Sequence, residues 1–174
     1  RLWEHSLGVG LCASLLAMVT GQAKPEEALV CGLIHDVGKT VINNAIPEVY
    51  EQIYEQMYEQ EKPVHEIEDE KLGFNHTVIG SLIAKKWKLP EKLEIVITYH
   101  HTNPYPEYED QGYADICNIV RVADQICLNL AIGLKKPLTT NIDYEDLDIT
   151  KEALDELIGL FKIKFDKQKE YLLT

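Results

Sequence analysis

The feature that most constrains the fold of this chain is an aspartate beside a histidine inside an apolar run. The run reads Gly32-Leu33-Ile34-His35-Asp36-Val37-Gly38-Lys39. A buried carboxylate is costly unless it is paired, hydrogen-bonded or bound to a cation. The chain must therefore fold so that compensating groups surround Asp36, and a divalent cation would serve this purpose.

Length and charge narrow the class of protein. The 174 residues suit a single domain, residues 1–174, with a substantial core. The formal net charge of −12 argues against nonspecific binding to nucleic acid or to anionic membranes, so we expect neither as a partner. A local cationic pocket could still hold a phosphate. No apolar run reaches the roughly 20 residues of a membrane span. Because the chain opens at Arg1 within a predicted helix, we interpret it as a domain excised from a longer protein.

The four cysteines are scattered through apolar stretches and form no CxxC pair, which is unlike a zinc cluster. We interpret them as reduced core residues and expect a cytoplasmic protein.

Hydrophobic periodicity predicts helix in nearly every segment, so the expected fold class is all-α, a compact multi-helix bundle. The β-branched run Ile95-Val96-Ile97-Thr98 fits inside a helix better than in a strand. The clearest loop is 102–112, and 137–148 is a turn-rich connector. The predicted helices cover residues 1–20, 25–36, 47–62, 64–72, 75–88, 90–101, 113–133 and, as one or two helices, 150–174.

Several metal-ligand side chains lie in apolar helical surroundings. His5, His76, His100 and Asp124 each share a predicted helix face with apolar or small residues. A buried histidine is usually bonded to backbone groups, so each histidine alone has that alternative. For Asp124 the alternative is a salt bridge to Arg121, one turn earlier.

The histidine–aspartate pair itself has a simpler explanation, a helix C-terminus with the aspartate in a turn. Against it, Asp36 is unfavourable near the negative end of a helix without a cation. Lys39 could neutralise Asp36 directly or contact a phosphate oxygen of a substrate. His101 is expected at a helix end and half-exposed. His65 is expected on the surface, because its helical neighbours Glu68 and Asp69 indicate a solvated acidic face.

Together these residues predict a divalent-metal site between helices of a bundle. Imidazole and carboxylate donors fit iron, manganese, zinc, nickel or magnesium and do not choose among them. No residue is assigned to an organic cofactor. The predicted metal ligands are His5, His35, Asp36, His76, His100, His101 and Asp124.

The ordered motifs resemble the HDOD family, within the HD superfamily of metal-dependent phosphohydrolases. His5, His35-Asp36 and Asp124 match the superfamily signature, and the resemblance implies metal ligation by them. It extends from residue 2 to about 130 and implies an all-helical fold with signalling or output roles. The narrower motifs are Leu2-Trp3-Glu4-His5-Ser6-Leu7, Glu26-Glu27-Ala28, Leu72-Gly73-Phe74-Asn75-His76 with Gly80, Trp87-Lys88-Leu89-Pro90, Tyr99-His100-His101 and Val122-Ala123-Asp124.

Related HD-GYP phosphodiesterases, which cleave cyclic di-GMP, hold a second metal with further histidines. His76, His100 and His101 are similar to these in order, so the resemblance implies one or two divalent metal ions. Lys39 matches the lysine after their HD pair. The GYP signature is absent, since Thr-Asn-Pro-Tyr-Pro-Glu-Tyr-Glu-Asp-Gln-Gly-Tyr follows His101. The resemblance therefore does not carry cyclic di-GMP over as a substrate.

Three functions fit the sequence. The favoured one is a signalling or output domain around a metal site, with a nucleotide or phosphoester ligand and with signalling proteins or an upstream domain as partners. The second is an active phosphohydrolase or phosphodiesterase acting on a nucleotide or cyclic dinucleotide, with catalytic roles for Asp36 and Lys39. In this hypothesis Asp36 could bridge two ions, one held by His5, His35 and Asp124 and the other by His76 and His100, with His101 as a further candidate. The third is a helical scaffold whose polar residues pair internally.

Overall fold

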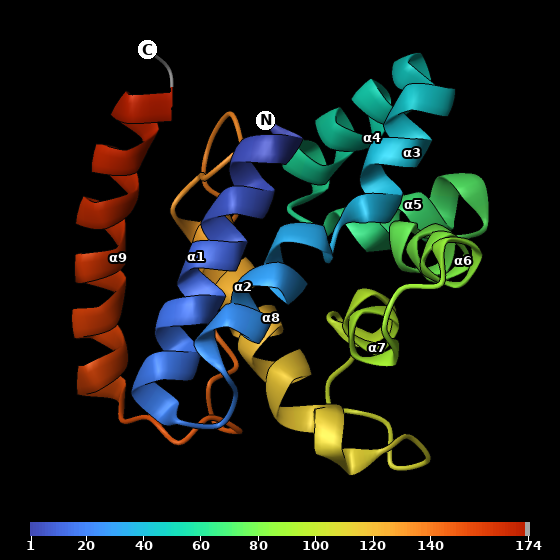
Figure 1. Cartoon of the computed structure of the whole chain (residues 1–174). Coiled ribbons are helices and arrows are strands. Elements are labelled where there is room, and N and C mark those ends of the chain that lie inside the picture. The colour runs from blue at the N-terminus through green and yellow to red at the C-terminus, as the bar shows by residue number, and fades with distance from the viewer. Residues whose placement is uncertain (173–174) are drawn as a thin grey trace.

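The chain folds into a bundle of helices joined by turns and loops (Figure 1), seen in a computed structural model that describes residues 1–172 and side chains through residue 169. No strand occurs among the described residues, which confirms the predicted all-α class. The helices are α1 (Leu2–Thr20), α2 (Pro25–Ile34), α3 (Val37–Ala45), α4 (Pro47–Gln60), α5 (Val64–Leu72), α6 (His76–Trp87), α7 (Glu91–Tyr99), the 3-10 turn η1 (Gln111–Tyr113), α8 (Ala114–Asn129) and α9 (Lys151–Leu172).

Helix ends follow local sequence signals. Gly21 ends α1 in the left-handed conformation, φ 69°, and its N–H donates to the carbonyl of Ala17. Pro25 occupies the first turn of α2, where a missing N–H costs nothing. The side chain of Asn75 accepts from the N–H of Thr77 and caps α6, as expected. These signals explain why most helix positions could be predicted.

The predicted helix over 25–36 is too long by two residues. α2 ends at Ile34, His35 and Asp36 form a turn, and α3 begins at Val37 without having been predicted as a separate helix. The histidine–aspartate pair therefore lies at a corner between two helices. From this corner both side chains can face the same interior space, although adjacent residues diverge within a helix.

Two boundaries near the end of the chain also differ. The predicted 113–133 helix ends earlier, because α8 closes at Asn129. Residues 150–174 form one helix, α9, rather than two, and the last two predicted residues lie outside the described part.

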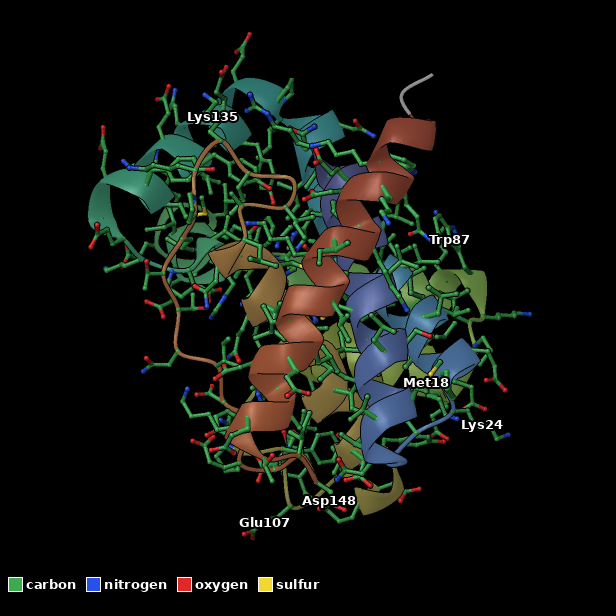
Figure 2. All side chains as sticks on the ribbon, turned by 90° about the vertical axis from the view of Figure 1, so that its left-hand side faces the viewer. Met18, Lys24, Trp87, Glu107, Lys135 and Asp148 are labelled. Atoms are coloured by element: carbon green, nitrogen blue, oxygen red, sulfur yellow. The ribbon has the colours of Figure 1, made fainter. Side chains whose placement is uncertain are left out.

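α1 lies at the centre of the larger core and packs against α2, α8 and α9. Figure 1 shows α9 running alongside α1, and the turned view of Figure 2 shows the same pair side by side. α1 and α2 meet backbone to backbone, since a Cβ on Gly32 would lie 2.6 Å from the Cα of Gly10. This close approach brings the start of α1 and the corner after α2 into one region.

α3 is held against α6 by a second close approach. A Cβ on Gly38 would lie 1.9 Å from the carbonyl oxygen of His76, so only glycine fits there. The contact sets the first residue of α6 directly beside the His35-Asp36 corner.

A smaller core joins α4 and α5 and includes Tyr50, Ile53, Met57 and Ile67. It lies next to the corner and contributes residues to the site described below. All four cysteines are buried and unpaired, as predicted for core residues.

α1 also changes one expectation. By length and composition this 19-residue helix is apolar enough to cross a membrane, so the expectation that no apolar stretch is long enough does not hold for it. In the structure it packs among the helices of the bundle and carries His5 toward the site.

Candidate metal centre

Seven side chains predicted as ligands converge at one place. They come from the start of α1, the corner between α2 and α3, the start of α6, the end of α7 and the middle of α8. Six of them are buried, while His101 is half-buried. Segments more than 100 residues apart thus supply one polar cluster inside an apolar bundle.

The first ligand group contains His5, His35 and Asp124, whose donor atoms lie within 4.8 Å of one another. The Nε2 of His5 lies 2.9 Å from the Oδ1 of Asp124. The Nε2 of His35 lies 3.9 Å from the same oxygen. Two imidazoles and a carboxylate at this spacing are compatible with one metal site.

The second group contains Asp36, His76, His100 and His101, again with donor atoms within 4.8 Å of one another. The Nε2 of His76 lies 3.4 Å from that of His100 and 3.1 Å from that of His101. The convergence of three imidazole nitrogens and a carboxylate oxygen is compatible with a second metal site beside the first.

Asp36 lies between the two groups and turns one oxygen toward each. Its Oδ2 is 3.3 Å from the Nε2 of His35 and 3.7 Å from that of His5. Its Oδ1 is 3.2 Å from the Nε2 of His76 and 3.6 Å from that of His100. This is the arrangement of a carboxylate that can bridge two cations.

Four of the histidines are oriented by the nitrogen that faces away from the centre. The Nδ1 of His5 lies 3.1 Å from the carbonyl oxygen of Ile132, and that of His35 lies 2.7 Å from the carbonyl oxygen of Gly32. A carbonyl only accepts, so each Nδ1 carries a proton and each Nε2 is the nitrogen that faces the centre.

His76 and His100 follow the same rule. The Nδ1 of His100 donates to the carbonyl of Ile97 at 3.0 Å, and the Nδ1 of His76 donates to Glu68 at 2.6 Å. Fixing the outer nitrogen sets the tautomer that a metal ligand needs.

Two buried atoms of the centre have no hydrogen-bond partner among the described residues, the Nε2 of His35 and the Oδ1 of Asp36. Unpartnered buried polar atoms are rare, and these two point at the places where the two groups converge. The donor set therefore fits metal ions, and nitrogen and oxygen donors without thiolate leave the identity of the metal open.

The centre also shifts proton affinities. Burial alone would raise the pKa of Asp36, but the charges of His35 and Lys39 hold it well below its usual range. The pKa of Asp124 is likewise lowered, against burial, by the hydrogen bond from His5. Both carboxyls are therefore anionic at neutral pH, as ligation requires.

Four of the histidines divide into two kinds. Burial lowers the pKa of His100 to about 4 and also lowers that of His101, so both are neutral and can ligate. For His5 and His76 burial is outweighed by carboxylate partners, Asp124 and Asp36 respectively, and the pKa is raised. Metal binding must displace protons from this second kind.

Lys39 neutralises Asp36 in the structure, the first of its two predicted roles. Its Nζ lies 2.6 Å from the Oδ2 of Asp36. Burial disfavours the ammonium, but the charge of Asp36 raises the pKa of Lys39 above its usual range, so it is charged.

Arg121 is not the partner of Asp124. It donates to the side chain of Asn118 at 2.7 Å and lies 3.3 Å from Asp146, whereas Asp124 pairs with His5. The alternative of an Arg121–Asp124 salt bridge is wrong, because α8 turns the two side chains toward different neighbours.

The interpretation of the acidic face on α5 was also wrong. Glu68 is fully buried and accepts from the N–H and Nδ1 of His76, at 2.8 and 2.6 Å, and from the hydroxyl of Tyr50 at 2.7 Å. The sequence did contain an indication that Glu68 is buried. Val64 and Leu72, four residues before and after it on the same helix face, are both apolar.

His65 is half-buried rather than on the surface. Its ring stacks on that of His101, with centroids 4.2 Å apart and planes inclined by 19°. Burial lowers the pKa of His65 to about 4. His65 therefore packs against His101, the half-buried ligand candidate.

Comparison with known proteins gives a consistent result. The HDOD domain family matches residues 1–103. An uncharacterized protein of Treponema pallidum is 33% identical over 110 residues, 63% of this chain and 21% of that protein. Ribonuclease Y of Mycoplasma genitalium is 24% identical over 160 residues, 91% of this chain and 25% of that protein. The chain spans a quarter or less of the length of these curated relatives.

Solved structures share the fold. An HDOD domain protein of unknown function from Geobacter sulfurreducens has a TM-score of 0.70 at 28% identity, covering 98% of this chain and 59% of that one. A candidate signal transduction protein from Marinobacter aquaeolei has a TM-score of 0.80 at 18% identity, with 95% and 37% covered. A candidate phosphohydrolase from Shewanella amazonensis has a TM-score of 0.63 at 22% identity, with 94% and 53% covered.

Proposed function

Because the chain belongs to the HDOD domain family, we propose that it is the signalling domain of a longer protein and that its centre binds two divalent metal ions and hydrolyses a phosphoester. The observation that carries this proposal is the position of Asp36, which offers one oxygen to each ligand group. A scaffold that only needed to neutralise a buried charge would be satisfied by Lys39 alone.

The first site would be held by His5, His35 and Asp124, and the second by His76, His100 and His101, with Asp36 shared between them. Two bound ions would supply a water of lowered pKa and offset charge on the phosphoryl oxygens.

The chain's own residues prepare the centre for this chemistry. The four outward Nδ1 protons are held by carbonyl or carboxylate oxygens, so the imidazoles need no reorientation to ligate. Lys39 is the charged cation beside Asp36, and it can move from that carboxylate to a phosphoryl oxygen of a bound ester.

We further propose a small phosphoester rather than RNA as the ligand. Ribonuclease Y acts on RNA by its name, but this chain corresponds to a quarter of that protein and has a net charge of −12. Such a charge disfavours a long polyanion. We place the protein in the cytoplasm, with other parts of its longer chain and signalling proteins as partners.

A second function is a regulatory metal or nucleotide site without turnover. The observation in its favour is the Lys39–Asp36 ion pair at 2.6 Å, which neutralises the shared carboxylate and competes with a cation for it. In this case the occupancy of the centre, rather than a product, would carry the signal.

Metal content and turnover together test both. Protein prepared without a histidine tag should contain up to two metal ions per chain by elemental analysis, and Asp36→Asn should lose them. Asp124→Asn should also lose metal. Asp115, on the same helix α8, is exposed, so Asp115→Asn should keep the metal content and serves as the control. Metal-loaded protein should hydrolyse a member of a panel of phosphomonoesters, nucleotides, cyclic dinucleotides and short RNA.

The results of these two measurements distinguish hydrolysis from regulation. Two ions without turnover would support the regulatory function and refute hydrolysis. No stoichiometric metal under any loading condition would overturn the metal centre itself.

A further inference from the structure

A cleft of about 570 Å³ opens beside the candidate metal centre, between the start of α1, the helices α3 and α4, and the turn 133–135. Its volume suits a small organic ligand. The sides are largely aromatic and polar, with Trp3, Asn43, Tyr54 and Tyr58 among them.

The cleft adjoins the centre through a small hollow of about 20 Å³, room for little more than a water molecule. His5 and Lys39 line the hollow on the side of the centre. Leu2, Tyr54, Gly133 and Leu134 line both spaces, and the side chains of Leu2, Tyr54 and Leu134 form the partition between them. A ligand in the cleft is therefore separated from Lys39 by this partition and the hollow behind it.

We propose that this cleft binds the planar, uncharged part of the phosphoester, of nucleoside type, and that the side chains of Leu2, Tyr54 and Leu134 turn aside to admit its phosphate to the metal centre, because the hollow between them is too small for a phosphate group. This deepens the proposed function and rests on it. Trp3, Tyr54 and Tyr58 offer aromatic faces on which a base can stack. The amide of Asn43 can pair with the edge of a base.

The charges of the cleft favour a neutral occupant. Glu51 and Glu55 oppose Arg1 and Lys135, so the formal charges cancel. A second phosphate would gain nothing from such walls, whereas the carboxylates can accept from amino groups on a base.

Contacts hold the walls in place and connect them to the centre. The hydroxyl of Tyr58 accepts from the N–H of Lys135 at 3.0 Å. The ring of Tyr54 meets that of Tyr50 edge-on at 5.3 Å, and Tyr50 donates to Glu68, the partner of His76. A chain of direct contacts through Tyr50 and Glu68 therefore links Tyr54 to the predicted metal ligand His76.

The test uses adenosine, guanosine, cytidine and uridine as probes, because they carry no phosphate and need no metal. Trp3 lines the cleft, and Trp87→Phe removes the other tryptophan, so the fluorescence of Trp3 reports occupancy. Figure 2 shows Trp87 and Lys135 at opposite sides of the molecule, so Trp87 lies away from the cleft.

At least one nucleoside should quench this signal saturably. Tyr54→Leu should weaken binding about five- to tenfold, the loss of one stacking contact. Tyr108→Leu, an exposed loop tyrosine, should leave binding unchanged. If Tyr54→Leu fails to fold, Asn43→Ala should weaken binding where the exposed neighbour Asn44→Ala does not.

Absence of saturable quenching by all four nucleosides at about 10 mM, or equal weakening by each variant and its control, would overturn the cleft assignment. Nucleoside binding by Asp36→Asn protein that has lost its metal would uphold the cleft while separating it from the centre. In metal-loaded protein, the 5′-monophosphate of the bound nucleoside should bind at least tenfold tighter, and equal affinity would refute the path to the metals.

Discussion

Glu68 offers the sharpest test of how the centre is held. Its carboxylate is fully buried, accepts two hydrogen bonds from His76 and one from Tyr50, and is ionised because the hydrogen bond from His76 lowers its pKa against the effect of burial. In Glu68→Gln the amide oxygen can keep both bonds to His76, and the amide NH₂ can donate to the hydroxyl of Tyr50. The geometry survives, and the negative charge behind the imidazole is removed.

We therefore expect metal affinity to fall because a charge is lost, while the geometry of the site is kept. Removing the partner behind a histidine ligand typically costs 10- to 100-fold in metal affinity, about 1.4–2.7 kcal/mol. The unfolding free energy of the metal-free protein should fall by only about 1–2 kcal/mol, because charge-assisted hydrogen bonds become neutral ones. Glu68→Ala should cost more, since it leaves the N–H of His76 unsatisfied in a buried space.

Titration of chelator-treated protein with Mn²⁺ or Zn²⁺ by calorimetry measures the affinity, and denaturant unfolding measures the stability. Glu66→Gln is the matched control, because Glu66 is exposed on the same helix. Unchanged metal affinity in folded Glu68→Gln protein would refute a role of this charge at the centre and leave Glu68 a structural residue.

Other predictions address packing and pH. Gly38→Ala should destabilise the fold by about 2–3 kcal/mol or more in thermal or denaturant unfolding, because its Cβ would meet the carbonyl oxygen of His76 and force α3 from α6. Gly159→Ala, with open space around it in α9, should stabilise by about 0.5–1 kcal/mol, and an equal response of both variants would contradict this packing argument. The low native pKa of His65, about 4 against 6.5 when unfolded, means that only the unfolded state takes up this proton between those values, so metal-free protein loses stability as pH falls from about 6.5 to 4. His65→Gln should recover on the order of 1–3 kcal/mol of that loss, and parallel stability–pH curves for both proteins would show that His65 does not contribute. Metal addition at pH 7 should release protons from His5 and His76, whose pKa values are raised, and binding without proton release in a weakly buffered titration would refute the assigned charge states.

Some errors of prediction have local causes. α3 was missed because Gly38 and the pair Asn43-Asn44 are typical of turns, so no helix was predicted between residue 36 and Pro47. Glu68 was missed because a carboxylate among other acids on an amphipathic helix normally faces water. Glu68 can be buried because α4 and α6 pack next to it and place the hydrogen-bond donors of Tyr50 and His76 against its carboxylate.

The sequence by itself determined the helical class, most helix boundaries and the identities of the seven candidate ligands, because these depend on periodicity, on caps and on polar residues in apolar surroundings. Only the tertiary structure decided the distances and orientations at which these ligands meet, since those follow from how helices cross. The close approaches at Gly32 and Gly38 bring α1, the corner and α6 together, and they leave Asp36 with one oxygen toward each group. The buried carboxylate that first constrained the fold is thereby the point on which both halves of the centre converge.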